Sequence, residues 1–260
     1  MPTPRFLWKV SAFDGATLTT NSEASGLPAT NLQNAIVRRP WRTAGITQQT
    51  WVVFDLGTAT LVNCAGIFGH NLRSTAAITL QGNASDSWGA PTFNVALTLI
   101  TDPDGIVHEK AMTLAQGTFR YWRLAIQDPS SVNTYWEIGR LMAGNAYTPA
   151  VPYTLEDPSR MQLDPSILDI AEGQQAYARL RTQYSRYRVR FENLERTDQD
   201  AFLALFRHRG NVQPLMVVVD PTDAHTTPRD TLYGRITTPL QWVLTNMVYG
   251  TVDLELEEVW

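Results

Sequence analysis

The sequence predicts a mostly β chain in two domains, the second of which also carries one α-helix. In the first half, short apolar runs alternate with turn-rich polar segments, and no long 3.6-residue period interrupts them. Many short strands at this spacing indicate a β-sandwich or barrel. The candidate strands are Phe6–Val10, Trp51–Asp55, Ala65–Phe68, Ala77–Gln81, Val95–Ile100, Phe119–Ile126 and Trp136–Leu141.

The first domain is predicted to be organised around the apolar run from Trp51 to Leu56. Its β-branched and aromatic residues suit a half-buried pleated surface. Gly57 is expected to end the strand at a turn, because glycine tolerates backbone conformations that other residues avoid. Trp41 is too large and apolar to remain in water at low cost, so it should pack on this sheet.

A proline-rich stretch separates the two halves. Residues 144–158 contain three prolines and little periodicity, and proline removes a backbone donor and restricts the preceding residue. We therefore place a domain boundary here, with domains at residues 1–147 and 148–260.

The second half contains two strictly alternating runs whose outward residues have opposite charges. Both runs indicate half-buried antiparallel strands. If they are neighbours, cross-strand pairs should set register or partner choice more than stability, since each exposed pair contributes roughly 0–1 kcal/mol. Their outward residues are Arg186, Arg188 and Arg190 in one run and Asp253, Glu255 and Glu257 in the other. A solvated strand face, a subunit interface and a nucleic-acid surface all fit these arginines.

One helix is predicted between these runs, at about residues 198–209. Phe202, Leu205 and Phe206 would form its apolar face, and Gly210 would end it. Apolar runs at 214–221 and 232–236 indicate further strands.

Composition narrows the class of protein. The 260 residues are 43% hydrophobic and 18% charged, which suits a chain with packed cores. The net charge of −4 argues against nucleic-acid binding by the chain as a whole. Cys64 is the single cysteine, so no internal disulfide can form, and we expect folding in a reducing cytoplasm. We expect neither a signal peptide nor a membrane span.

The sequence favours neither a catalytic site nor a metal-binding site. The histidines have no zinc-protease spacing, and no nucleophile elbow, phosphate loop or dinucleotide fingerprint occurs. Asp220, Asp223 and His225 could gather a metal, but a polar turn is the simpler interpretation. Residues 102–105 begin like a calcium loop without its later glutamate. We therefore predict no enzyme activity, no metal and no cofactor.

The first half resembles the discoidin, or F5/8 type C, domain, a galactose-binding-like jelly roll. The resemblance covers roughly residues 5–147, although Gly139 and Arg140 depart from the family pattern of the last strand. It rests on Trp41 with the strand ending Asp55-Leu56-Gly57, on Ser22-Glu23, on Ala29-Thr30-Asn31-Leu32, on Phe119–Ile126 and on Tyr135–Leu141. It implies a jelly-roll β-sandwich with ligand-binding loops at one end.

The second half, about residues 150–260, resembles the ring-forming β-sandwich of phage distal-tail and minor tail proteins. The resemblance rests on the arginine-rich strand ending at Leu194, the helix, the apolar strand ending at Pro221, and Leu232–Arg235. Ile67–Leu72 also resembles discoidin-like domains of phage tail genes.

Together, the resemblances imply a structural protein of a phage tail tip, in the virion. The second domain would form a ring through its charged strands, beside neighbouring tail-tube and tail-tip proteins, and the first would project from it. The alternative is an adhesin that binds host surface glycans, with Asn71 and Arg73 as hydrogen-bonding groups and Trp88 as a stacking ring. Trp88 could instead cover an edge of the core, and Asn71 could simply close a turn.

Overall fold

The computed structural model describes residues 3–46, 49–101, 107–128, 133–154, 159–170, 176–222, 230–239, 241–244 and 249–259. Two compact units emerge: Pro2–Thr148 with Met216–Leu232, and Pro149–Leu215 with Tyr233–Val259. The predicted boundary at residues 147/148 lies beside one junction of these units, and the assignment of two domains with that single boundary stays a prediction.

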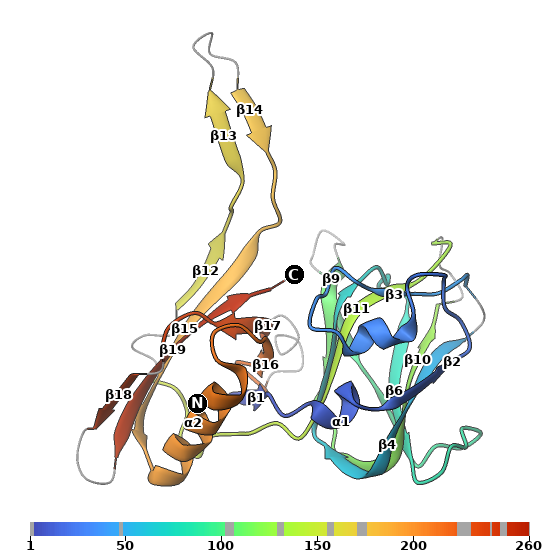
Figure 1. Ribbon diagram of the computed structural model, residues 1–260, viewed down its shortest axis with the longest axis horizontal. Coiled ribbons are helices and arrows are strands. Elements are labelled where there is room, and N and C mark those ends of the chain that lie inside the picture. The colour runs from blue at the N-terminus through green and yellow to red at the C-terminus, as the bar shows by residue number, and fades with distance from the viewer. Residues whose placement is uncertain are drawn as a thin grey trace. The chain divides into compact units, whose positions relative to one another are not determined.

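The larger unit contains two five-stranded antiparallel sheets (Figure 1). One sheet has the order β2-β4-β10-β6-β7 and the other β3-β11-β5-β9-β8. The strands of the first sheet are β2 Thr17–Thr20, β4 Thr50–Val62, β6 Ala77–Asn83, β7 Phe93–Ala96 and β10 Gly117–Gln127. Those of the second are β3 Trp41–Arg42, β5 Cys64–His70, β8 Thr98–Thr101, β9 Val107–Thr113 and β11 Glu137–Gly144. The remaining elements are β1 Arg5–Leu7, α1 Ser11–Asp14, η1 Ala29–Gln33 and most of β16, Leu215–Val218. The last four residues of β17, Thr231–Ile236, belong to the smaller unit, where they pair with β19, Gly250–Glu258.

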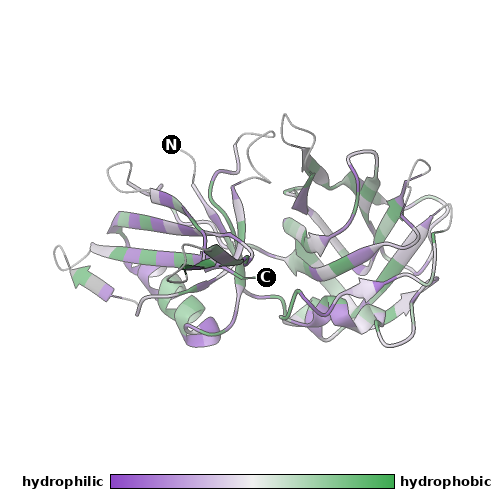
Figure 2. Ribbon diagram, turned by 90° about the horizontal axis from the view of Figure 1, so that it is seen from above, coloured by the Kyte–Doolittle hydropathy of each residue, from purple (hydrophilic) through white to green (hydrophobic). Residues whose placement is uncertain are grey.

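The core of this unit lies between the two sheets. Phe54 and Trp122 come from the first sheet, Trp41 and Ile138 come from the second, and all four are almost completely buried. Figure 2 shows hydrophobic and hydrophilic residues alternating along many strands. This is the pattern of sheets with one face in a core. The mostly β, sandwich prediction is confirmed, and Trp41 is buried as predicted.

Gly57 does not end its strand, contrary to the prediction. The strand β4 continues to Val62, and its pairing with β10 shifts register between Phe119 and Tyr121. Gly57 has a φ of 72°, and its N–H donates to the Asp55 carboxylate at 2.8 Å. The glycine therefore allows an irregularity inside a long ladder rather than a turn at its end. The predicted strand Val95–Ile100 is likewise split between β7 and β8, which belong to different sheets.

The two departures from the discoidin pattern have a local cause. A Cβ on Gly139 would lie 2.2 Å from the Val37 carbonyl oxygen, so only glycine fits there. The buried Arg140 guanidinium binds the Asp14 carboxylate at 2.7 Å and the Leu32 carbonyl at 3.1 Å. Arg140 thus attaches α1 and η1 to β11, and Gly139 lets the backbone at Val37 approach the same strand.

The smaller unit contains an antiparallel sheet covered by one helix. Its strands are β12 Ser159–Leu163, β15 Tyr184–Leu194, β18 Gln241–Leu244 and β19 Gly250–Glu258. The strand β15 lies between β12 and β19, and β18 pairs with β19. The helix α2, Arg196–Arg209, packs Phe202 against Phe191 of β15, with ring centroids 5.2 Å apart. The predicted helix is confirmed, begins two residues earlier, and ends before Gly210 with a φ of 54°.

A separate two-stranded sheet was not predicted. It consists of β13, Ile167–Ile170, and β14, Ala176–Arg179, which pair only with each other.

Candidate functional site

Several connections converge at one end of the sandwich in the larger unit. Ile126, near the end of β10, pairs with Thr50, the first residue of β4, and with Ile78, the second residue of β6. Ile138, at the start of β11, pairs with both Trp41 and His70. The described segments beside these positions, 43–46, 71–76 and 133–136, therefore lie at the same end.

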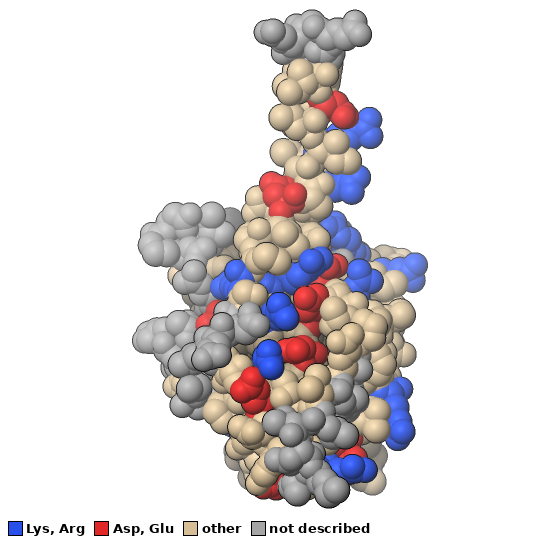
Figure 3. Space-filling view, turned by 90° about the vertical axis from the view of Figure 1, so that its left-hand side faces the viewer, with Lys and Arg blue, Asp and Glu red and all other residues tan. Residues whose placement is uncertain are grey.

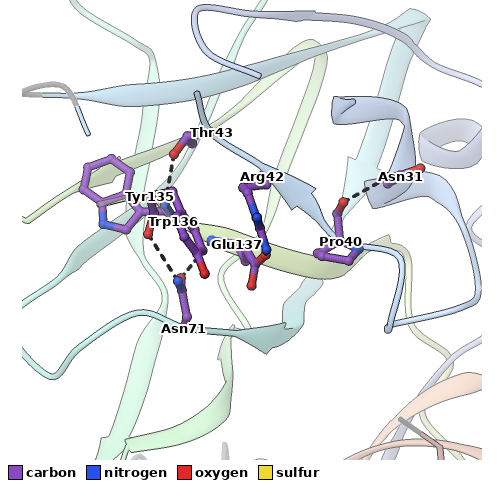
Figure 4. A network of polar contacts seen from close by, with 8 residues as sticks. All are labelled: Asn31, Pro40, Arg42, Thr43, Asn71, Tyr135, Trp136 and Glu137. Carbon is purple, nitrogen blue, oxygen red and sulfur yellow. Dashed lines mark hydrogen bonds and ion pairs between the residues drawn. The ribbon is translucent and has the colours of Figure 1, made fainter. Parts of the chain in front are cut away.

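Two polar brackets hold residues 135–137 at this end (Figure 4). On one side, the Asn71 amide donates to the Tyr135 carbonyl at 3.2 Å and accepts from the Glu137 N–H at 2.8 Å. On the other side, the Thr43 N–H donates to the Trp136 carbonyl at 3.0 Å, and the Thr43 hydroxyl accepts from the Trp136 N–H at 2.9 Å. Both sides of this short segment are thus fixed by hydrogen bonds.

The brackets position three side chains, Arg42, Tyr135 and Glu137, which we call the loop-end cluster. The Arg42 guanidinium carbon lies 4.1 Å from the centre of the Tyr135 ring, and its Nε and Nη2 both bind Glu137 Oε1. All three side chains are partly exposed, Arg42 by 36% and Glu137 by 22%. Within the described contacts, Arg42 Nη1, Glu137 Oε2 and the Tyr135 hydroxyl have no hydrogen-bond partner. The cluster therefore offers donors, acceptors and an aromatic ring to a ligand.

The structure does not bring the three predicted ligand residues together. Asn71 lies beside the loop-end cluster, but both ends of its amide are used in the bracket. Arg73 is exposed in the same connection, before β6. Trp88 follows β6, whose seven residues span roughly 20 Å. Asn71 is thus a positioning residue for the cluster, and direct ligand binding by Arg73 or Trp88 stays a prediction.

Trp88 covers an arginine on the outer face of the first sheet. The Arg123 guanidinium carbon lies 4.7 Å from the Trp88 ring centre, and Arg123 Nε donates to Gln81 Oε1 at 2.6 Å. Trp88 Nε1 donates to the Asp86 carboxylate at 2.6 Å. Burial lowers the pKa of Arg123 from its ordinary value, and the nearby Asp86 charge opposes this. Trp88 is half-buried, and these contacts hold its ring in place. The length of β6 separates this second aromatic surface from the loop-end cluster.

Sequence reasoning missed Arg42 and Glu137 as candidate ligand residues, although it had identified the motifs that contain them. The signal was present, because an arginine follows Trp41 and a glutamate follows Trp136. Only the pairing of β3 with β11, which places Arg42 opposite Glu137, joins these two motifs.

Of the predicted metal ligands, Asp220 is described, and its carboxylate accepts from the Thr222 N–H at 2.9 Å and from the Thr222 hydroxyl at 2.6 Å. Residues 102–105, Asp223 and His225 lie outside the described residues. Across the described ranges, no three His, Cys, Asp or Glu side chains gather as a metal site would require. Cys64 is buried, and burial raises the pKa of its thiol to about 12, which disfavours the reactive thiolate. No helix in the described part of the chain is long and apolar enough to cross a membrane.

The two charged strands of the smaller unit are neighbours, so their arginine and carboxylate rows face each other, as expected for that case. Arg186 lies opposite Glu257, Arg188 opposite Glu255, and Arg190 opposite Asp253. Figure 3 shows basic and acidic side chains close together on one face of the protein. Their use as a subunit interface stays a prediction.

The individual pairs in these charged rows differ. Partial burial disfavours the Glu257 carboxylate, yet hydrogen bonds from Arg186 at 2.8 Å and Arg235 at 3.2 Å outweigh burial and lower its pKa. Arg188 is exposed and makes no ion pair among the described contacts. Arg186 is therefore neutralised within the chain, whereas Arg188 is open to a partner.

Comparison with solved structures finds carbohydrate-binding and lectin modules. A mutant of chitosan-binding module 1 from a chitosanase/glucanase of Paenibacillus sp. IK-5 is 18% identical; the match covers 52% of this chain and 97% of that one, with a TM-score of 0.40. Module 2 of the same enzyme, in complex with chitotriose, is 16% identical, with coverages of 52% and 99% and a TM-score of 0.38. The lectin domain of lectinolysin, complexed with Lewis B antigen, is 14% identical, with coverages of 52% and 96% and a TM-score of 0.40.

None of these three structures is described as a phage-tail protein, and the phage-tail resemblance stays a prediction. No protein-family model matches the chain, and no curated protein matches it.

His70 leads to a prediction on pH dependence. Burial lowers the pKa of His70 to about 4 from 6.5, and its Nδ1 accepts from the Leu72 N–H at 3.3 Å. Since the unfolded chain takes up this proton first, stability should be unaffected above pH 6.5 and fall as the pH drops toward 4. The full effect is about 3 kcal/mol. His70→Gln, which keeps an acceptor, should flatten this part of the curve of unfolding free energy against pH.

The measurement is chemical denaturation at a series of pH values. His208→Gln, a substitution on the exposed surface of α2, controls for the loss of an imidazole. If His70→Gln and the unmodified chain lose stability in parallel between pH 6.5 and 4, His70 is not the cause.

Proposed function

We propose that the protein is a non-catalytic carbohydrate-binding protein whose ligand contacts the loop-end cluster. The observation that supports this proposal is the rigid presentation of Arg42, Tyr135 and Glu137, with unused hydrogen-bonding atoms, by loops that converge at one end of the sandwich. The known binding of chitotriose and Lewis B antigen by proteins with related modules is compatible with the proposal and does not carry it.

The chemistry of the cluster suits a sugar. A pyranose presents several hydroxyl groups that donate and accept hydrogen bonds, together with a less polar face of C–H groups. A carboxylate accepts strongly and a guanidinium donates in a fixed plane, so they can bind neighbouring hydroxyls. Arg42 and Glu137 also neutralise each other, which favours an uncharged ligand over an anion. The Tyr135 ring, held by its segment's two brackets, supplies an apolar surface with a polar tip.

A glycan array followed by calorimetry on the strongest ligand tests the proposal. Glu137→Gln should weaken binding about tenfold or more, because one hydrogen bond to a charged group is worth roughly 1.5–3 kcal/mol. Tyr135→Ala should also weaken binding about tenfold or more, because it removes the aromatic ring that packs on the sugar. Trp88→Ala is the matched control for loss of an aromatic residue at the other end of β6, and it should bind like the unmodified chain.

Two results would overturn the assignment. Binding that is lost in Trp88→Ala but kept in Tyr135→Ala would move the site to the Trp88 surface. An array with no bound glycan would remove carbohydrate recognition altogether.

We also propose, as a second candidate, a structural role in the tail tip of a phage or phage-like virion. A ring of copies would form through the charged strands of the smaller unit, beside tail-tube and tail-tip proteins. The observation that favours it is Arg188, an exposed cation without an ion pair in the described contacts, in a row whose neighbour Arg186 is already paired.

Charge reversal at two adjacent positions of β15 tests this role. Arg188→Glu should weaken self-association and lower the melting temperature less than Arg186→Glu does, because no described ion pair joins Arg188 to Glu255. Arg186→Glu, the matched control, should lower the melting temperature, because it places a second carboxylate against Glu257. Sedimentation analysis and thermal unfolding provide the two readouts. An Arg188→Glu chain that assembles normally, or a strictly monomeric unmodified chain, contradicts the ring.

A further inference from the structure

One arginine on the outer face of the first sheet is buried without a carboxylate beside it. Arg123 lies in the second half of β10, and only 8% of the residue is exposed. It forms no ion pair among the described contacts. Burial of a charged side chain is unfavourable unless an opposite charge and hydrogen bonds compensate for the lost water. The free protein therefore holds a cation whose compensation is incomplete.

The guanidinium of Arg123 is fixed at one nitrogen and unused at the other two. Its Nε donates to Gln81 Oε1 at 2.6 Å, and Gln81 Nε2 in turn donates to Asn94 Oδ1 at 3.2 Å. Among the described contacts, Nη1 and Nη2 donate to no acceptor, and neither atom is completely buried. The two amides thus hold the plane of the guanidinium and leave both Nη groups for another molecule.

The loop after β6 covers one side of this guanidinium. The Trp88 ring centre lies 4.7 Å from the Arg123 guanidinium carbon. Asn83, the last residue of β6, holds the loop, because its amide donates to the Ser87 carbonyl at 2.7 Å and accepts from the Thr92 hydroxyl at 2.9 Å. An aromatic ring stabilises a cation through its π-face, but it supplies no oxygen acceptor for the Nη groups. Trp88 therefore does not replace the missing carboxylate.

A second arginine on β10 shows what a fully paired guanidinium on this sheet looks like. Arg120 also lies near an aromatic ring, with its guanidinium carbon 4.8 Å from the Tyr121 ring centre. Its Nε and Nη2 bind the two oxygens of Asp55 at 2.7 and 2.8 Å. The hydrogen bond from Arg120 is the main reason that the pKa of Asp55 falls to about 2. Arg123 has the same kind of aromatic neighbour without the carboxylate.

Asp86 is close enough to influence Arg123 but does not pair with it. Its charge raises the pKa of Arg123 against the larger, opposite effect of burial. Asp86 is exposed, and its Oδ1 accepts from Trp88 Nε1 at 2.6 Å. No hydrogen bond or ion pair joins it to Arg123 among the described contacts. Asp86 therefore weakens the attraction of Arg123 for an anion without taking the anion's place.

The two unused nitrogens fit a carboxylate. They donate in one plane, which matches the two oxygens of a carboxylate group. Because Gln81 occupies Nε, the ligand must approach the guanidinium from its Nη end. The opening is narrow, since so little of Arg123 is exposed. A flat carboxylate can enter such an opening edge-on more easily than a tetrahedral sulfate or phosphate group can.

The surroundings of Arg123 suit the rest of a sugar. Asn94 is exposed on β7, two strands from β10, and its amide nitrogen has no partner among the described contacts. At the spacing of neighbouring strands it lies roughly 10 Å from Arg123, where it can donate to a hydroxyl group. The half-buried Trp88 also leaves part of an aromatic surface exposed, which suits the less polar face of a pyranose.

We propose that the outer face of the first sheet carries a second ligand site, in which the Nη groups of Arg123 bind the carboxylate of an acidic sugar, such as a hexuronic acid. The loop-end cluster favours an uncharged sugar, so the two sites take different ligands. The Arg123 site rests on its own contacts and stands if binding at the loop-end cluster is disproved.

Calorimetry with two matched probes tests the proposal on the full chain. The probes are the trisaccharide of galacturonic acid and the same trisaccharide with its carboxyl groups methylated. The acid should bind about tenfold more tightly than the ester or better, because hydrogen bonds between two charged groups are about twice as strong as neutral ones. A neutral glycan bound at the loop-end cluster should not compete with the acid.

Substitutions along the hydrogen-bonded row assign the acid to Arg123. Arg123→Met should weaken binding of the acid about tenfold or more, because it removes the charged donors. Gln81→Glu keeps the arginine and gives it a carboxylate partner in the chain, so it should weaken binding of the acid as well. Asp86→Asn keeps an acceptor for Trp88 Nε1 and should strengthen binding about threefold, because it removes a repulsive charge.

Arg120→Met is the matched control. It removes an arginine of the same strand whose donors are already used by Asp55, so the affinity for the acid should stay within about twofold. Circular dichroism on every variant checks that the sheets are retained.

Four results would contradict the proposal. Equal affinity for the acid and its methyl ester, or unchanged binding in both Arg123→Met and Gln81→Glu, removes the site. An equal loss in Arg120→Met and Arg123→Met would show a general effect of net charge. Competition between the acid and the neutral glycan would assign the acid to the loop-end cluster. Tighter binding of a sulfated galactose trisaccharide would overturn the choice of a carboxylate.

Discussion

The hydrogen-bonded bracket around the segment 135–137 is the constraint on which the candidate site depends. The Asn71 amide accepts from the Glu137 N–H and donates to the Tyr135 carbonyl, so it ties the end of β5 to the start of β11. Without that bracket, the Tyr135 ring and the Glu137 carboxylate would lose rotational freedom only on binding, at a cost in affinity. Fixing them in the free protein makes the loop end a preorganised surface rather than a mobile connection.

The fold could be predicted because alternation of apolar and polar residues directly reports which faces are buried. The paired strands β15 and β19 show this most clearly, because each outward arginine lies opposite a carboxylate, at the register that the alternation implies. Gly57 was harder, because a glycine with a positive φ serves a turn and a bulge equally well. The two-stranded sheet of β13 and β14 was not predicted, because its exposed strands lack the long apolar run that marks a buried strand.

The candidate site was predictable only in part. Asn71 belongs to the correct end of the sandwich, but its neighbours along the chain gave no sign that its amide is consumed by backbone groups. Trp88 was grouped with it because both occur in polar segments flanking one strand. A seven-residue strand places its two flanks at opposite ends of a sheet. Arg42 and Glu137 are 95 residues apart, and only strand pairing joins them.

The loop-end cluster is polar and internally neutral, which suits a hydroxylated ligand bound reversibly. The most direct test of carbohydrate binding at the loop-end cluster is a nuclear magnetic resonance titration of the isotope-labelled chain with an array-selected glycan. The account predicts that the largest amide shifts occur at Arg42, Thr43 and Tyr135 to Glu137, while the amides around Trp88 stay in place. Shifts confined to residues 84–92, or spread evenly over the chain, would contradict it.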